Sequence, residues 1–163
     1  MRWKVAILTA SDKGAAGERE DTSAQVIREL MEEEIGGEIV EYRVVPDDQD
    51  EITAALIEIT EYYRPDLIVT TGGTGLGPRD VTPEATERVI ERKVPGLAEA
   101  MRIGAMHKTR AAMLSRGIAG IRGRTLIINL PGSPKGVQES LMAIIDQLPH
   151  ALAILTGRET EHV

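Results

Sequence analysis

Short apolar runs alternate along the chain with longer segments whose apolar residues recur at helical spacing. The runs at residues 3–9 and 67–71 are short and apolar, and residues 38–45 alternate between apolar and polar positions, as strands do. The segments 22–35 and 51–64 carry the apolar stripe of amphipathic helices. This alternation predicts a mostly parallel sheet with helices on both faces.

The second half of the chain continues the pattern and adds an antiparallel pair. Residues 117–121 and 125–130 predict two strands joined by a tight turn, which extend one edge of the sheet. Further helices are expected at residues 83–92, 97–110, 137–148 and 149–155. We therefore predict an α/β fold: residues 1–163 form one domain, a three-layer α/β/α sandwich with a mostly parallel sheet and an antiparallel edge.

Polar residues with a preference for helix N-termini mark where three of these helices should begin. Asp21-Thr22 or Ser23 caps the first helix, and Asp50 is the predicted cap of the second. The helix after the central strand is predicted to be capped by Thr82, with Pro83 at its first position.

The central strand, residues 67–71, leads into a loop with glycines at positions 72, 73, 75 and 77. Without Cβ atoms, the backbone amides of such a loop can turn inward and approach a ligand closely. The loop matches neither common nucleotide signature, because Pro78 replaces the third glycine of G-x-G-x-x-G and Pro78-Arg79 replaces the Lys-Ser/Thr of a P-loop. The sequence therefore predicts a phosphate-type pocket of another kind, or glycines that only make room for packing.

Four polar segments should meet at one edge of the predicted sheet, because ligands of open α/β sheets bind beyond the carboxyl ends of the strands. These are Ser11-Asp12-Lys13, Pro46-Asp47-Asp48, the loop 72–80 and the turn 130–136. Together they supply amides, hydroxyls, cations and carboxylates. That combination suits phosphate chemistry, in which one or two carboxylates hold a magnesium ion.

Each candidate also has a purely structural interpretation. Asp80 could cap the following helix or pair with Arg79, and Asp47 could be an ordinary turn former after Pro46. Ser133 could be a turn residue, and Lys135 a solvated charge. Convergence of the four segments is therefore the argument for a site, since no single residue makes it.

Composition narrows the function classes. The absence of cysteine excludes disulfides, thiolate catalysis and cysteine-based metal sites, and it fits a reducing cytoplasm. A net charge of −7, with no basic helix and no phenylalanine, disfavours nucleic acid as a partner. The apolar stretch after Met1 is too short for a signal peptide or a membrane span, so we expect a cytoplasmic protein with no membrane partner.

Several motifs resemble the molybdenum-cofactor biosynthesis family that contains MogA and MoaB. They are Thr70–Gly75, Arg79–Thr86, Pro46–Gln49 and Leu130–Gly136, together with Ser11-Asp12. The resemblance implies a compact α/β domain that binds molybdopterin. In the adenylyltransferase branch, it also implies that Mg²⁺ and ATP are used to form adenylyl-molybdopterin and pyrophosphate.

The resemblance also implies roles for individual residues. Asp47 and Asp80 match the catalytic, metal-associated pair of the family, and the loop 72–75 and Ser133 fall where the family binds pterin and phosphate. With the converging segments, this gives the candidate binding residues Ser11, Asp12, Thr71, Gly72, Gly73, Thr74, Gly75, Arg79, Gly132, Ser133 and Lys135. Family members are commonly trimers and sometimes hexamers, and handover to a molybdenum insertion protein is implied.

Two other functions remain open at this point. The first is a non-catalytic molybdopterin-binding or scaffold protein of the same fold. The second is an unrelated regulator that binds a sugar phosphate or nucleotide. Retention of both Asp47 and Asp80 favours the enzyme.

Overall fold

Six strands form one sheet in the order β2-β1-β3-β6-β5-β4, in a computed structural model that describes residues 2–158. The strands are β1 (Trp3–Ala10), β2 (Gly37–Val45), β3 (Leu67–Thr71), β4 (Arg92–Lys93), β5 (Ala119–Arg122) and β6 (Thr125–Leu130). Neighbours among β2, β1, β3 and β6 pair in parallel, whereas β5 pairs antiparallel with both β6 and β4. The predicted sheet with an antiparallel edge is thus confirmed. Residues 1 and 159–163 of the predicted domain lie outside the described part.

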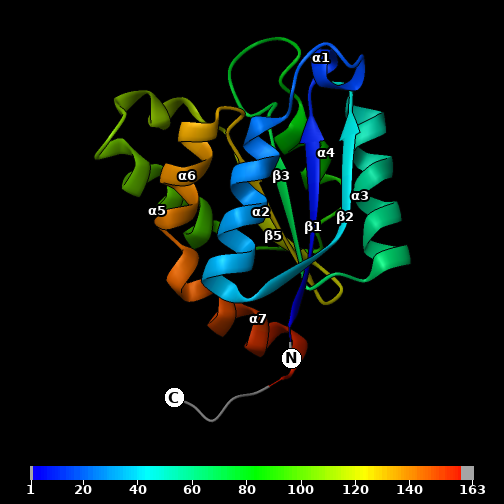
Figure 1. Ribbon diagram of the computed structural model, residues 1–163, viewed down its shortest axis with the longest axis vertical. Coiled ribbons are helices and arrows are strands. Elements are labelled where there is room, and N and C mark those ends of the chain that lie inside the picture. Colours follow the sequence, from blue (N-terminus) through cyan, green and yellow to red (C-terminus); the bar gives the residue numbers. More distant parts are fainter. Residues whose placement is uncertain (1, 159–163) are drawn as a thin grey trace.

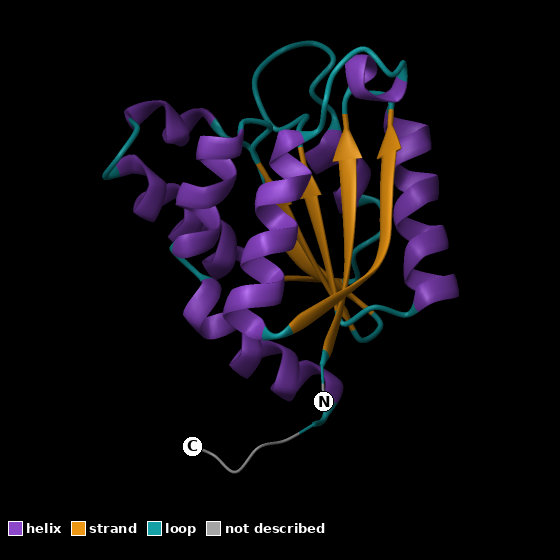
Figure 2. Cartoon of the chain, in the orientation of Figure 1, coloured by secondary structure: helices purple, strands orange, loops and turns teal. Residues whose placement is uncertain are grey.

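Helices cover both faces of the sheet, as the alternating sequence pattern predicts (Figure 2). The helices are α1 (Asp12–Ala15), α2 (Thr22–Ile35), α3 (Gln49–Tyr63), α4 (Thr82–Glu87), α5 (Pro95–Met106), α6 (Pro134–Met142) and α7 (Leu148–Thr156), with 3₁₀ helices η1 (Arg110–Leu114) and η2 (Ile145–Gln147). One apolar core joins α2, α5, α6 and α7 to one face, and a second joins α3 and α4 to the other. The three-layer α/β/α arrangement is therefore confirmed.

The central strands are apolar throughout because both of their faces are buried. On β1, Val5 and Ile7 face the core under α2, while Ala6 and Leu8 face the core under α3. On β3, Val69 faces the core under α2 and Ile68 faces the core under α3. This placement accounts for the continuous apolar runs that predicted buried parallel strands.

Two predicted helix caps are wrong. Asp48, not Asp50, caps α3, because its Oδ2 accepts the Glu51 amide at 3.0 Å. Thr82 does not cap α4: Val81 occupies the cap position without a side-chain bond, and Thr82 is the first helical residue. The Thr82 amide instead donates to the Gly73 carbonyl at 3.1 Å, so the start of α4 is held by the glycine loop.

Several predicted element bounds are also corrected. The polar segment after β1 contains the short helix α1, because the Ser11 hydroxyl accepts the Gly14 amide and closes one turn. The helix predicted over 83–92 ends at Glu87, and the chain then forms the edge strand β4. The helix predicted over 97–110 begins at Pro95, whose fixed φ suits a first helical position, and ends at Met106.

No helix within residues 2–158 combines the length and the apolar character needed to span a bilayer.

Candidate functional site

The loops that follow the parallel strands gather at one end of the sheet, where the arrowheads of β1, β2 and β3 point (Figure 1). The strand order places β1 between β2 and β3, so the chain leaves neighbouring strands in different directions and opens a crevice between their ends. A cavity of about 480 Å³ lies there, which we call the β1 cavity. Its lining includes Ser11, Asp47, Thr71, Gly72, Gly73, Asp80, Gly132 and Ser133, all of them sequence candidates.

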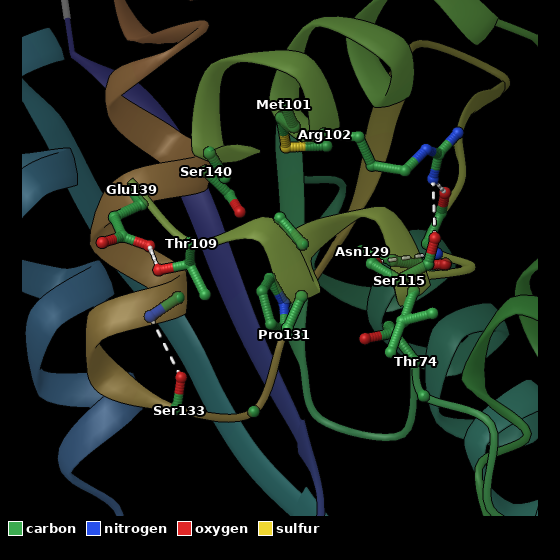
Figure 3. Close-up of a pocket in the computed structure, with 18 of the residues that line it drawn as sticks. Thr74, Met101, Arg102, Thr109, Ser115, Asn129, Pro131, Ser133, Glu139 and Ser140 are labelled. Carbon is green, nitrogen blue, oxygen red and sulfur yellow. Dashed lines mark hydrogen bonds between the residues drawn. The ribbon is translucent and has the colours of Figure 1, made fainter. Parts of the chain in front are cut away.

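A second cavity of about 430 Å³, the α5 cavity, lies against α5, η1 and α6 (Figure 3). Thr74 and Gly75 line it, together with apolar side chains such as Met101. The two cavities share four residues: Gly73, Asp80, Gly132 and Ser133. The glycine loop and the turn before α6 therefore form the common wall of two adjoining hollows.

Backbone geometry requires glycine at the first two positions of the loop. Gly72 has φ +94°, and a Cβ there would lie 2.4 Å from the Ala10 carbonyl oxygen. Gly73 has φ +72°, and a Cβ there would lie 2.2 Å from the Thr82 hydroxyl oxygen. These glycines let the loop pass close to both β1 and α4, and they also serve packing, as the structural interpretation predicted.

The turn before α6 is fixed from two sides. Thr71 Oγ1 donates to the Pro131 carbonyl and Ser23 Oγ donates to the Gly132 carbonyl, each at 2.6 Å. Ser133 Oγ accepts the Gly136 amide at 3.0 Å and so caps α6. Ser133 is therefore a helix cap that also lines both cavities.

Asp47 is held by a reciprocal pair of hydrogen bonds with Asp12. The Asp12 amide donates to Asp47 Oδ2 and the Asp47 amide donates to Asp12 Oδ1, both at 3.0 Å. Burial raises the pKa of Asp47, and the charges of Asp12 and Asp80 act in the same direction. A cation beside Asp47 would relieve this unfavourable charge.

Arg79 pairs with Asp12. Its Nε and Nη2 donate to the two carboxylate oxygens of Asp12 at 3.1 and 2.9 Å, and these bonds lower the pKa of Asp12. Asp12, Arg79 and Lys135 do not line either cavity, so the structure places these three candidates around the site and not on its walls.

Asp80 neither caps α4 nor pairs with Arg79. Its Oδ2 accepts the Gly77 amide at 2.9 Å, which closes the tip of the glycine loop. The same oxygen lies 2.9 Å from where a Cβ of Gly75 would be. The Asp80 carboxylate therefore sits under the loop and contributes to the walls of both cavities.

Several polar residues in and around the site were missed by sequence reasoning, among them Asp21, Asn129 and Arg116. Asp21 lines the β1 cavity, where its carboxylate accepts hydrogen bonds from Thr9 and Tyr42. Asn129 lines the α5 cavity from β6, and Arg116 contacts the glycine loop. Only the isolated asparagine within an apolar strand could have been noticed from the sequence, because an amide in a buried strand needs partners.

Asn129 links three segments behind the α5 cavity. Its amide nitrogen donates to the hydroxyls of Thr70 and Thr86 at 3.0 Å, and its carbonyl oxygen accepts the Ile118 amide at 3.1 Å. Across the cavity, Thr109 and Glu139 point toward one another and share a hydrogen bond of 3.1 Å (Figure 3). The cavity is thus lined by polar groups whose positions are set by neighbouring elements.

The described residues contain no cluster of three or more histidine, cysteine, aspartate or glutamate side chains arranged to hold a metal. The polar chemistry of the β1 cavity includes three aspartates, Asp21, Asp47 and Asp80, together with hydroxyls and the glycine loop at the carboxyl end of a parallel sheet. Fold and site together define an α/β protein with a switch-point crevice of the kind that binds anionic ligands.

Comparison with known proteins then identifies the family. The model of the probable molybdopterin binding domain matches residues 6–150, so the chain belongs to that family, and the resemblance predicted from its motifs is confirmed. The chain is 42% identical to the molybdopterin adenylyltransferase of Helicobacter pylori over 154 residues, which cover 94% of this chain and 88% of the relative.

Solved structures show the same relationship. The molybdopterin biosynthesis enzyme MoaB of Thermus thermophilus superposes with a TM-score of 0.91 at 53% identity, covering 96% of this chain and 98% of the other. The tungsten cofactor synthesizing protein MoaB of Pyrococcus furiosus superposes with a TM-score of 0.83 at 37% identity, covering 94% and 97%. The chain is therefore similar along nearly its whole length to both adenylyltransferases and MoaB proteins.

Proposed function

We propose that this protein is a molybdopterin adenylyltransferase that uses Mg²⁺ and ATP. A phosphate oxygen of molybdopterin attacks the α-phosphorus of ATP, and a new P–O bond forms. The bond between the α-phosphorus and the bridging oxygen breaks, and pyrophosphate leaves with that electron pair. The products are adenylyl-molybdopterin and pyrophosphate.

The observation that carries this proposal is the pair of cavities with a common wall. A transfer between two bulky substrates needs two adjoining sites whose reacting phosphates meet, and the cavities meet at Gly73, Asp80, Gly132 and Ser133. Loop amides and hydroxyls at this wall suit phosphate oxygens. Relatives at 36–42% identity named molybdopterin adenylyltransferase support the same reaction.

No general base is needed for this reaction. A phosphate monoester has a second pKa of about 6 and is already largely dianionic near neutral pH. The work of the protein is then to bring two polyanions together and to stabilise the charge that develops as the α-phosphorus is attacked. This explains why the site offers carboxylates, amides and cations and no acid–base pair.

The residues present fit a magnesium ion. Mg²⁺ is usually held by one or two carboxylates together with substrate phosphates and water, and Asp47 and Asp80 both line the β1 cavity. Burial and the negative charges of Asp12 and Asp80 raise the pKa of Asp47, and a cation bound beside it would oppose both effects. A magnesium ion bound there supplies charge neutralisation on the phosphate oxygens. Arg79 adds positive charge nearby while it holds Asp12, which in turn orients Asp47.

Similarity to a MoaB structure supports a second candidate function, that of a non-catalytic molybdopterin-binding protein. The MoaB structure from Thermus thermophilus is 53% identical to this chain, and in the family a non-catalytic protein would bind molybdopterin for handover without reacting it. Such a protein would need a cavity that binds molybdopterin, but it would not need the pair of aspartates. The presence of Asp47 and Asp80 on one cavity wall favours the enzyme.

Release of pyrophosphate separates the two functions. Purified protein is mixed with molybdopterin, ATP and Mg²⁺, and pyrophosphate is measured over time. We expect release that requires both substrates and the metal. Tight binding of molybdopterin with no release above the protein-free rate would establish the binding protein and reject the enzyme, and binding of neither substrate would reject both.

The proposed function extends to the location, the oligomeric state and the partner of the protein. We propose a cytoplasmic location, where ATP is plentiful and a cysteine-free chain is at no disadvantage. A homotrimer, or a hexamer of two trimers, and handover of the product to a molybdenum insertion protein are part of the same proposal. Light scattering of the purified protein tests the oligomeric state, and product transfer to an added insertion protein tests the handover.

A further inference from the structure

Arg116, between η1 and β5, is bonded to both ends of the glycine loop. Its amide donates to the Thr74 carbonyl and its Nε donates to the Gly75 carbonyl, each at 2.8 Å. Its Nη2 donates to the Asp80 carbonyl at 2.6 Å, and its Nη1 pairs with the Glu84 carboxylate at 2.5 Å. Arg116 therefore spans the loop: its backbone amide holds Thr74, and its guanidinium holds Gly75, Asp80 and the first turn of α4.

These bonds determine how the loop presents its amides. The C=O and N–H of a trans peptide point in opposite directions, so carbonyls turned toward Arg116 send the following amides the other way. The amides concerned are those of Gly75, Leu76 and Val81, which come directly after the bonded carbonyls of Thr74, Gly75 and Asp80. Arg116 thus sets the direction of three amides in the loop that separates the two cavities: that of Gly75 through its backbone amide, and those of Leu76 and Val81 through its side chain.

The contacts are of a strong kind. Bonds from a guanidinium are charge-assisted, and the planar fork of arginine can serve several acceptors at once. The bond from Arg116 also holds the pKa of Glu84 below its usual range, as expected for an ion pair in good geometry. The loop itself contributes little rigidity, because its tip is closed only through Asp80 and Gly77 among the bonds within residues 75–80.

We propose that Arg116 is a positioning residue for the adenylyl transfer, fixing the loop amides and the Asp80 carboxylate relative to both substrates. This inference rests on the proposed function, although the contacts that carry it belong to Arg116 itself. Arg116 does not itself line either cavity, so it acts through Asp80 and the loop that it holds.

The test compares Arg116→Ala with Arg122→Ala. Arg122 is a matched control at the other end of the sheet: it is similarly half-buried, donates to the Val89 carbonyl and pairs with Glu61. Four quantities are measured on each folded variant: kcat, KM for ATP, amide hydrogen exchange of residues 73–81, and the melting temperature. Arg116→Lys keeps the charge without the planar fork.

We expect Arg116→Ala to lower kcat about 100-fold with little change in KM for ATP, since a displacement near 1 Å at a reacting group has an effect of this size. Exchange of the loop amides should accelerate in Arg116→Ala and stay at the wild-type rate in Arg122→Ala. Arg116→Lys should recover only part of kcat. If Arg116→Ala does not fold, Glu84→Gln removes one of the anchors, and a smaller loss of kcat with faster loop exchange is then expected.

Two results would overturn the proposal. The first is a melting temperature lowered in Arg116→Ala with unchanged kcat in the folded enzyme, which would show a structural role only. The second is loop exchange equal to that of Arg122→Ala. If the wild-type protein releases no pyrophosphate, the proposed function fails, and the exchange measurement still decides whether Arg116 fixes the loop.

Discussion

The two strand-to-helix junctions at the site are built in opposite ways. After β6, the chain reaches α6 within three residues, and Ser133 caps the helix with Pro134 at its first position. After β3, the chain takes a ten-residue loop before α4, and that helix has no side-chain cap. The first junction combines its own Ser133 cap with bonds from Thr71 and Ser23 to its carbonyls. The second lacks a side-chain cap, and Arg116 from a distant segment bonds to its carbonyls.

The difference fits the proposal that the long junction serves two substrates. A self-capped turn is stable in one conformation because its own residues satisfy its amides. The long loop leaves amides available for ligands, and it keeps Thr82 Oγ1 buried without a hydrogen-bond partner in the described structure. Functional loops often retain such local costs because the surrounding structure stabilises them. The following predictions test whether the two junctions differ in this way, starting with the largest effect.

Asp80→Asn should abolish most of the activity while leaving the fold intact. Asparagine retains an oxygen that can accept the Gly77 amide, so the loop tip stays closed and only the negative charge is lost. We expect kcat to fall roughly 100- to 1000-fold, the size seen when one preorganised electrostatic contact is removed. Asp50→Asn, an exposed carboxylate on α3, is the control and should react at the wild-type rate. An unchanged rate in Asp80→Asn would remove Asp80 from the site.

Gly73→Ala should destabilise the long junction by about 3 kcal/mol. Alanine at φ +72° is strained, and its Cβ would clash with the Thr82 hydroxyl. Gly17→Ala separates the two causes, because Gly17 has φ +76° with open space around it, so only about 1 kcal/mol is expected there. Urea unfolding of both variants measures the difference. Equal losses in the free energy of unfolding would show that close packing at Gly73 does not contribute to the effect.

Thr82→Val should stabilise the protein by about 1 kcal/mol. The Thr82 side chain is fully buried and its hydroxyl finds no partner among residues 2–158, so an isosteric apolar residue removes a desolvation cost. Thr86→Val is the matched variant: its hydroxyl accepts from Asn129, and the same substitution should destabilise by about 1 kcal/mol. Thermal unfolding gives both signs in one experiment, and a loss of stability in Thr82→Val would show that the hydroxyl is in fact satisfied.

Ser133→Ala should cost about 1 kcal/mol, the usual value of a lost helix cap. The bonds from Thr71 and Ser23 to this turn remain in the variant, so hydrogen exchange should increase at the first turn of α6 and not in the loop 73–81. Native-state exchange of the variant measures both regions. Faster exchange in the long loop would contradict the separation between the junctions.

Asp47→Asn should raise the melting temperature slightly at neutral pH. A carboxyl whose pKa is raised in the folded state binds its proton more tightly there, so ionisation destabilises the fold above that pKa. Below the ordinary value of 3.8, both states are protonated and the advantage of Asn should vanish. The carboxylate is partly exposed, so the gain is on the order of 1 °C after allowance for solvent screening. Melting curves at pH 7 and pH 3.5 check the sign.

Much of the fold could be predicted from the sequence because its signals are local. The apolar runs of β1, β3 and β6 and the helical spacing in α2 identify a parallel sheet with two covered faces. Capping at Asp21 was among the predicted choices for α2 and is confirmed.

The features that sequence reasoning missed depend on contacts between distant segments. The bond from the Thr82 amide to Gly73 outweighs the preference of threonine for a cap, and nothing near Arg116 in the sequence indicates the loop that it contacts. The bonds that connect Asp12, a predicted substrate-binding residue, to Arg79 and Asp47 also join segments that are far apart in the sequence. Local patterns therefore located the site, while the arrangement of its polar groups required the folded structure.

A crystal structure of the protein with ATP and Mg²⁺ tests the shared wall most directly. We predict that the triphosphate lies along the wall formed by Gly73, Asp80, Gly132 and Ser133, with the metal between the phosphates and the carboxylates of Asp47 and Asp80. A triphosphate bound outside this wall, or a metal that contacts neither aspartate, would contradict the account.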